Sequence, residues 1–358
     1  MRTYKIAAIP GDGIGIEVVG AGLDVLQACA ARDGTFALDV TEFDWGSARY
    51  RKTGALMPDN GVETLKAYDA ILFGAVGAPD VPDHVTLWGL RLAICQSLDQ
   101  YANVRPTRIL NGIQSRLRGV RAQDLDWVII RENSEGEYSG HGGRSHRGSS
   151  MEAATEVSVF TRAGVERIMR FAFEVARSRP RNELTVVTKS NAQRFGMVLW
   201  DEVAREVAAE YPDVACDKML VDAMTARMVL QPASLDTIVA TNLHADILSD
   251  LAAALAGSIG LAPTANLNPE RRFPSMFEPI HGSAFDITGQ GIANPLATFW
   301  SAVMLLDHVG EGAAARALMA AIERAAADPA LHTPDLGGYA TTRGVTDAVI
   351  GFIRGQNA

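Results

Sequence analysis

The sequence predicts an α/β protein with a largely parallel sheet, because short apolar segments rich in β-branched residues alternate with longer segments of helical spacing. In the longer segments apolar residues recur every three or four positions, as on one face of a helix. The chain has 358 residues, of which 47% are hydrophobic, and this is enough for large cores and indicates about two domains.

The alternation begins at the N-terminus, where residues 4–10 (YKIAAIP) predict a strand and residues 16–32 a helix. Further strands are expected at residues 36–44, 69–77, 126–132, 183–189 and 236–242. Further helices are expected at residues 162–178 and 192–211, and from about Ala313 onward. Residues 86–106 (TLWGLRLAICQSLDQYANVRP) predict an amphipathic helix leading into a short strand. Residues 139–150 (SGHGGRSHRGSS) lack periodicity and predict a surface loop rather than a phosphate-binding loop.

Composition excludes several classes of function. The net charge of −9 argues against nucleic acid or an anionic membrane as the main partner, although local arginines could still bind a small anion. The three cysteines, Cys29, Cys95 and Cys216, form no CxxC pair, so neither a disulfide framework nor a cysteine zinc site is expected. The apolar stretches are too short for a signal-peptide core or a membrane span, which predicts a soluble cytoplasmic protein.

The segment IPGDGIGIEVV follows the first strand and could suggest a dinucleotide-binding turn. Its glycines, Gly11, Gly13 and Gly15, give GxGxG rather than GxGxxG, and no acidic residue is convincingly placed about 20 positions later. Asp12 inside the turn would also repel a pyrophosphate. The segment therefore predicts a tight strand-to-helix turn and not a Rossmann site.

Carboxylates gather in two other segments. Asp246 and Asp250 stand four residues apart in NLHADILSDL, so they share one face of a predicted helix with largely apolar neighbours. Two such carboxylates repel each other, and a bound Mg²⁺ or Mn²⁺ would compensate. Asp222, in MLVDAMTARM, follows a strand and is either a helix cap or a third metal ligand.

Two strand ends carry candidate catalytic groups. Lys189 ends the strand in VVTKSNA and is either a solvated lysine or a general base whose pKa is lowered by burial. Arg131 ends the strand in IIRENSEGEYSG, and Tyr138 follows in a Gly-rich turn. An arginine there could bind a carboxylate and the tyrosine could donate a proton, but a surface ion pair and a packing tyrosine are the simpler explanation of this segment alone.

Taken together, these segments resemble the β-decarboxylating dehydrogenases of 2-hydroxy acids, a family that includes isocitrate, 3-isopropylmalate, D-malate and tartrate dehydrogenases. The resemblance covers nearly the whole chain and also includes YANVRP, TKSNA and FEPIHGSAFDITGQGIANP. It implies an isopropylmalate dehydrogenase-like fold, not a Rossmann fold, with two α/β subdomains and the active site between them. The cofactor side would comprise residues 1–103 and 257–358, and residues 104–256 would form the dimerisation and metal side.

The resemblance also implies roles for individual residues. Asp222, Asp246 and Asp250 would be metal ligands, Lys189 the base and Tyr138 the proton donor, with Arg105 and Arg131 holding the substrate. In this family the lysine and one aspartate come from a second subunit, which implies a homodimer with shared active sites. Members commonly require K⁺, and no motif in the sequence decides that point.

The C-terminal segment resembles the family's cofactor loop, and the residues implied in cofactor binding are Glu278, His281, Gly282, Ser283, Ala284, Asp286, Ile287 and Asn294. A carboxylate at Asp286 can accept from both ribose hydroxyls and would repel a 2′-phosphate, which favours NAD over NADP. Relatives often have a proline at the position of Phe285, so the detailed shape of the loop can differ.

One departure bears on the substrate. Most members carry an arginine ten residues before the one in NVRP, but here that position is Cys95, and Arg91 stands one helical turn earlier where isopropylmalate enzymes are apolar. A cation at that wall opposes an isopropyl group and favours a small hydroxyl-bearing diacid. We therefore expect oxidation of tartrate, and of D-malate as a second substrate, with β-decarboxylation as the following step. A 3-isopropylmalate dehydrogenase and a non-catalytic regulatory subunit of the same fold are the alternatives.

Overall fold

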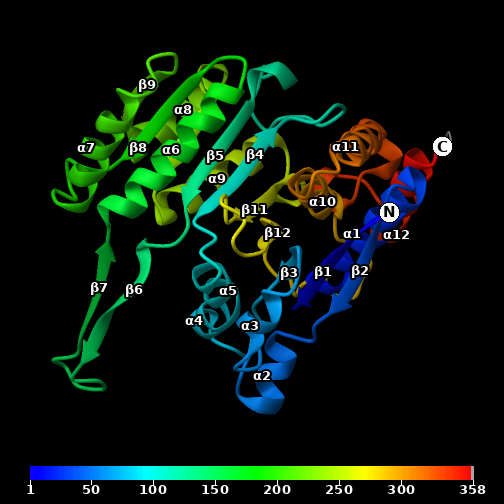
Figure 1. Cartoon of the computed structure of the whole chain (residues 1–358), viewed down its shortest axis with the longest axis horizontal. Helices are drawn as coiled ribbons and strands as arrows, with labels where there is room; N and C mark the ends of the chain where they lie inside the picture. The colour runs from blue at the N-terminus through cyan, green and yellow to red at the C-terminus, as the bar shows by residue number, and fades with distance from the viewer. Residues whose placement is uncertain (356–358) are drawn as a thin grey trace.

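The computed structural model describes residues 1–355 and contains a ten-stranded sheet with helices on both faces (Figure 1). The predicted α/β class is thereby confirmed. In spatial order the strands are β2 (Phe36–Glu42), β1 (Arg2–Gly11), β3 (Ala70–Ala75), β12 (Ser275–Pro279), β11 (Pro263–Leu267), β4 (Ala102–Arg108), β5 (Asp126–Glu132), β10 (Thr237–Ala240), β8 (Glu183–Thr188) and β9 (Ala215–Leu220).

Neighbouring strands are parallel in both outer parts of the sheet and antiparallel at its centre. The antiparallel pairs are β12 with β11, β11 with β4, and β4 with β5. Strands lie within all the segments where the sequence predicts them, whereas β11 and β12 were not predicted. Both are five residues long and interrupted by polar side chains, so neither shows the apolar pattern of a buried strand.

The half of the sheet that contains β1 is covered on both faces. One face packs against α1 (Gly15–Asp33), α10 (Leu296–Val309), α11 (Gly312–Ala327) and α12 (Thr342–Ile353). The other packs against shorter helices, namely α2 (Ser47–Thr53), α3 (Gly61–Leu65) and α5 (Leu92–Ser97), with a π-helical turn at Leu87–Arg91. The short helix α4 (Asp83–Thr86) precedes that turn. Alternation along β1 explains the two cores, because Ile6 and Ala8 face the long helices while Ala7 and Ile9 face the short ones.

The half that contains β5 follows the same rule. Val128 and Ile130 pack against α6 (Arg162–Ser178) and α7 (Gly196–Ala208), whereas Trp127 and Ile129 face the core that includes α8 (Val221–Leu230) and α9 (Asn242–Ala256). Single 3₁₀ turns occur at Ala122–Asp124, Pro232–Ser234, Ile259–Leu261, Pro329–Leu331 and Pro334–Leu336.

A separate antiparallel ribbon of β6 (Gly136–Ser145) and β7 (Ala153–Val159) projects away from the main sheet (Figure 1). The expectation of a loop at 139–150 is therefore wrong for its first part, which is a strand. The side chains of this ribbon are largely exposed, so its sequence has no apolar alternation that could mark a strand. Within residues 1–355, no helix combines the length and the apolar character needed to cross a bilayer.

Candidate active site

A cavity of about 220 Å³ lies at the antiparallel centre of the sheet, between α9 and the π-helical turn before α5. Its charged lining includes six side chains predicted from the sequence, namely Arg91, Arg105, Arg131, Asp246, Asp250 and Glu278. Residues from five separate regions of the chain thus meet at one site.

The start of α9 places the two aspartates. Thr241 is the N-cap of the helix, and its side chain accepts a hydrogen bond from the backbone N–H of His244. The hydroxyl of Thr241 donates in turn to Glu137 at 3.0 Å. Asp246 and Asp250 follow one turn apart, and both reach the cavity.

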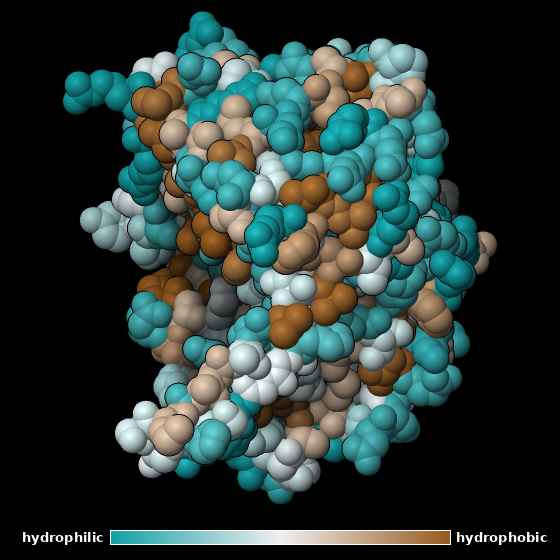
Figure 2. All heavy atoms as spheres, turned by 90° about the vertical axis from the view of Figure 1, so that its left-hand side faces the viewer, coloured by the Kyte–Doolittle hydropathy of each residue, from teal (hydrophilic) through white to brown (hydrophobic). Residues whose placement is uncertain are grey.

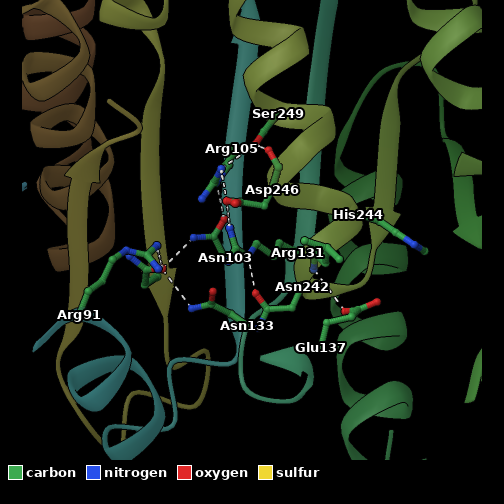
Figure 3. A network of polar contacts seen from close by, with 12 residues as sticks. Arg91, Asn103, Arg105, Arg131, Asn133, Glu137, Asn242, His244, Asp246 and Ser249 are labelled. Carbon is green, nitrogen blue, oxygen red and sulfur yellow. Dashed lines mark hydrogen bonds and ion pairs between the residues drawn. The ribbon is translucent and has the colours of Figure 1, made fainter. Parts of the chain in front are cut away.

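Two buried arginines face Asp246 from the neighbouring strands (Figure 3). Arg131, at the end of β5, pairs with Asp246 Oδ1 and donates through Nε to Asn242 at 2.8 Å. Arg105, on β4, lies 3.4 Å from the same carboxylate oxygen and donates to Ser249 at 2.5 Å. The helix and the strands therefore hold two cations and a carboxylate against one another.

Burial and mutual charge set the protonation of this group. Burial would raise the pKa of Asp246, but the guanidinium groups of Arg131, Arg105 and Arg91 outweigh it and hold that pKa below its usual value. Burial and the neighbouring Asp246 raise the pKa of Asp250. Burial, followed by repulsion from Arg131, lowers the pKa of Arg105 to about 9, which still leaves it charged at neutral pH.

Arg91 points into the cavity but has its own counterion. Its Nε lies 2.9 Å and its Nη2 2.7 Å from Glu278 Oε1, and both side chains are almost fully buried. Burial alone would lower the pKa of Arg91, but the carboxylate of Glu278 outweighs it and raises that pKa. Cys95 is fully buried in the neighbouring apolar core, and burial raises the pKa of its thiol to about 11. Cys95 is therefore a neutral packing residue.

A cluster of buried asparagines, which sequence reasoning missed, connects these arginines. Asn266 on β11 donates to Glu278 at 2.7 Å and accepts from Asn103 at 2.7 Å and from Asn133 at 3.1 Å. Asn103 accepts from Arg105 at 2.9 Å. The available signal was Asn103 in the predicted strand of YANVRP, because a buried amide in a strand needs a specific partner. Asn266 lies in β11, which was not predicted, so it carried no such signal.

Tyr138, at the base of the ribbon, also lines the cavity. The guanidinium of Arg131 lies 5.4 Å from the centre of its ring, within the range of a cation–π contact. Burial and the nearby Asp246 raise the pKa of Tyr138, so its phenol is protonated at neutral pH and can donate a proton.

Lys189 and Asp222 are not part of this cavity within the chain. They pair with each other at the start of α8, and the hydrogen bond from Lys189 lowers the pKa of Asp222. Within residues 1–355, no three His, Cys, Asp or Glu side chains are grouped closely enough to hold a metal ion. One chain therefore brings together two of the three predicted metal carboxylates.

The predicted cofactor loop runs along one side of the cavity. His281 and Gly282 line it, and Ala284 adopts a positive φ of 40°. Buried polar atoms of His281 (Nε2) and Ser283 (Oγ) have no hydrogen-bond partner among residues 1–355. Such atoms suit a polar ligand such as a dinucleotide.

The remaining residues of the loop differ in exposure. Asp286 is exposed, and Ile287 packs against a small core with Ile14 and Val18. The side chain of Asn294 is occupied within the chain, since its Nδ2 donates to Asp335 at 3.0 Å and its Oδ1 accepts from the backbone of Leu296 at 3.0 Å.

The N-terminal glycine turn supports this loop through its backbone. Ile14 N–H donates to the carbonyl of Ser283 at 2.8 Å, and a Cβ at Gly13 would lie only 2.0 Å from that same oxygen. Asp12 points elsewhere and accepts from Ser47 and Gly77. The turn thus requires glycine because of its close approach to Ser283 in the predicted cofactor loop.

Replacing Gly13 with alanine is expected to displace the loop. If the loop binds the nicotinamide cofactor as the sequence predicts, the KM for NAD should rise by about tenfold or more. Steady-state kinetics with varied cofactor would measure it. The matched control is Gly34→Ala, because Gly34 has a similar φ of 73° but no heavy atom within 4 Å of its added Cβ. Equal effects of the two variants would contradict the role of the close approach.

Comparison with known proteins identifies relatives over the whole length of the chain. A family model described as isocitrate/isopropylmalate dehydrogenase matches residues 5–349. The chain is 68% identical over 357 residues to a probable tartrate dehydrogenase/decarboxylase of Agrobacterium vitis, covering 100% of this chain and 98% of that protein. It is 51% identical over 360 residues to the decarboxylating D-malate dehydrogenase of Escherichia coli K12, covering 99% of each. The crystal structure of isocitrate dehydrogenase from Methylococcus capsulatus superposes with a TM-score of 0.88 at 36% identity, covering 98% of this chain and 99% of that one.

Proposed function

The chain belongs to the isocitrate/isopropylmalate dehydrogenase family, and from this premise we propose that it oxidises tartrate, and D-malate as a second substrate, at the C2 hydroxyl. NAD and Mn²⁺ or Mg²⁺ would be required, and β-decarboxylation would follow oxidation. The observation that carries the proposal is the cavity in which Arg105 and Arg131 face Asp246 beside Asp250. Relatives with the names tartrate dehydrogenase/decarboxylase and D-malate dehydrogenase support the choice of substrate.

The carboxylates suit a hard divalent cation. Asp246 and Asp250 offer oxygen ligands one helical turn apart, and Asp222 of a second subunit would complete the set. A metal held by these residues would supply a Lewis acid, and bound NAD would supply the hydride acceptor. The pKa of Asp250 is raised by burial and by repulsion from Asp246, and a bound cation would relieve that repulsion.

The side chains of this chain supply the remaining steps. Arg105 and Arg131 would hold the substrate carboxylate on the C3 side with paired hydrogen bonds. Lys189 of the second subunit, directly or through a water, would accept the proton of the C2 hydroxyl. Tyr138, whose raised pKa keeps it protonated, would donate a proton to C3 after CO₂ is lost.

The cofactor would lie along the loop that contains His281, Ser283 and Asp286. The unpartnered buried atoms of His281 and Ser283 support a polar ligand there. The exposed carboxylate of Asp286 can accept from ribose hydroxyls and would repel a 2′-phosphate. We therefore expect a higher kcat/KM with NAD than with NADP.

We further propose a homodimer in which residues 104–256 form the interface. Apolar side chains are exposed on α8 and α9, including Leu230 at 77% and Ile247 at 53%. Figure 2 shows apolar patches on the face of the molecule that carries α7 and the ribbon in Figure 1. Residues 1–103 and 257–358 would form the cofactor side, of which residues 356–358 lie outside the part that the structure describes.

A substrate panel tests the proposal. The purified chain is assayed with NAD and Mn²⁺ on the tartrate isomers, D-malate, isopropylmalate and isocitrate. The highest kcat/KM is expected with a tartrate isomer or D-malate, and exhaustive chelation is expected to abolish turnover. Faster turnover of isopropylmalate would favour the isopropylmalate enzyme instead. No NAD reduction by the chain alone on any of these acids would favour the non-catalytic subunit.

A further inference from the structure

We infer that Arg91, Glu278 and Thr264 form a neutral receptor for a hydroxyl group on C3 of the substrate. The inference rests on the proposed function, which supplies the diacid and its place in the cavity. It adds the group that distinguishes tartrate, with a hydroxyl on C3, from D-malate, without one. It also assigns Glu278 to substrate binding, in addition to the cofactor binding that the resemblance implies.

The ion pair between Arg91 and Glu278 provides the first part of the receptor. The side chains are only 12% and 5% exposed, so the two charges neutralise each other in a weakly screened environment. Arg91 also approaches Asn266 at 3.4 Å, and Asn266 donates to Glu278 at 2.7 Å, which fixes the carboxylate from a second side. The pair therefore has a fixed geometry and no net charge.

Hydrogen-bonding capacity remains on this pair. Nη1 of Arg91 donates to no residue among 1–355, whereas Nε and Nη2 are engaged. Oε2 of Glu278 accepts only from Arg91 Nε, at 3.1 Å, and a carboxylate oxygen can accept more than one hydrogen bond. The pair therefore retains a donor, Nη1, and an acceptor, Oε2, with unused hydrogen-bonding capacity, which suits a hydroxyl because a hydroxyl both donates and accepts.

Thr264 provides the second part. It is the direct cross-strand neighbour of Glu278 in the β11–β12 pair, so the two side chains lie on the same face of the sheet. Its residue is fully buried and lines the same cavity, and its Oγ1 has no hydrogen-bond partner among residues 1–355. A buried hydroxyl without a partner is unfavourable, and a substrate hydroxyl would satisfy it.

The charge of the whole cavity points to the same class of acid. Three arginines, Arg91, Arg105 and Arg131, face three carboxylates, those of Asp246, Asp250 and Glu278, so the lining is formally neutral. A divalent cation and a dicarboxylate together keep it neutral, whereas a tricarboxylate such as isocitrate leaves an extra buried negative charge. An isopropyl group would cover the ion pair without offering it a hydrogen bond.

The test compares substrates in two conservative variants, Thr264→Val and Glu278→Gln. Thr264→Val keeps the shape of the side chain and removes its hydroxyl, and we expect the ratio of kcat/KM for tartrate to that for D-malate to fall by about tenfold or more. Glu278→Gln leaves Arg91 without its counterion, and we expect activity on isocitrate relative to tartrate to rise by about tenfold. The matched control is Thr237→Val, since Thr237 is also a buried strand threonine with an unpartnered hydroxyl but lies outside the cavity lining.

Calorimetric titration with tartrate and with D-malate, in the presence of NADH and Mn²⁺, measures the dissociation constant of each acid. The ratio of these two constants reports the discrimination between the acids without requiring turnover. If the protein is inactive but still binds tartrate more tightly than D-malate, the receptor is supported and the proposed function is overturned. If the tartrate to D-malate ratio in Thr264→Val and the isocitrate to tartrate ratio in Glu278→Gln both equal those of the wild type, the receptor is overturned. The proposed function would be unaffected by that result. If Glu278→Gln does not fold, the ratio in Thr264→Val alone decides.

Discussion

Mixing two inactive variants, Lys189→Ala and Asp246→Asn, is expected to restore about a quarter of the wild-type turnover, because half of the random dimers are mixed and each holds one intact site. In the described chain Lys189 pairs with Asp222 outside the cavity that Asp246 and Tyr138 line. An active site that needs all four residues must then combine two subunits. Each variant alone is expected to lose about 10³-fold or more in kcat, through loss of the base or of a metal ligand.

The experiment uses differently tagged subunits that are unfolded and refolded together. Turnover is measured on the whole refolded mixture, where about a quarter is expected, and on the doubly purified mixed dimer, where about half of the wild-type turnover is expected because one of its two sites is intact. The matched control mixes Lys189→Ala with Asp222→Asn. Under the proposal, Lys189 and Asp222 are both supplied by one subunit to the active site of the other, so every site in this mixed dimer should remain defective and no activity should return. Recovery in the control mixture, or none in the Lys189→Ala and Asp246→Asn mixture although mixed dimers form, would contradict shared active sites.

The sequence was sufficient for the fold class because apolar patterns are local. Alternation along β1 and the helical spacing of α1 require only neighbouring residues, and both elements form where they were predicted. The β6–β7 ribbon was missed because it is held by backbone pairing between largely exposed side chains. No apolar signal marks such a ribbon.

The part of the candidate site that depends on local spacing could be predicted from the sequence. Asp246 and Asp250 share a helix face, which spacing alone reveals. The partner of Arg91 could not be found in this way, because Glu278 lies 187 positions away and reaches it only through a strand that was not predicted. Arg91 was therefore expected to act as a free cation, whereas the structure gives it a counterion of its own.

Replacing Tyr138 with phenylalanine is expected to lower kcat by about 10²- to 10⁴-fold, the usual contribution of a positioned proton donor. The ring would keep its contact with Arg131, which lies 5.4 Å from its centre, so the cavity should keep its shape. The raised pKa of Tyr138 means that the wild-type phenol carries its proton at neutral pH. The proposed transfer of that proton to C3 would follow the loss of CO₂. Oxidation at C2 precedes that transfer and does not need it.

Rapid-mixing kinetics with D-malate and NAD can therefore separate the two steps. In Tyr138→Phe we expect a burst of about one NADH per site followed by a slow steady state, as when a late step limits turnover. The control is Tyr101→Phe, because Tyr101 donates to Glu270 at 2.8 Å and does not line the cavity, and its kcat should stay within about twofold of wild type. A Tyr138→Phe enzyme that loses the burst as well would place the tyrosine in the oxidation step, and one with wild-type turnover would exclude it as the proton donor.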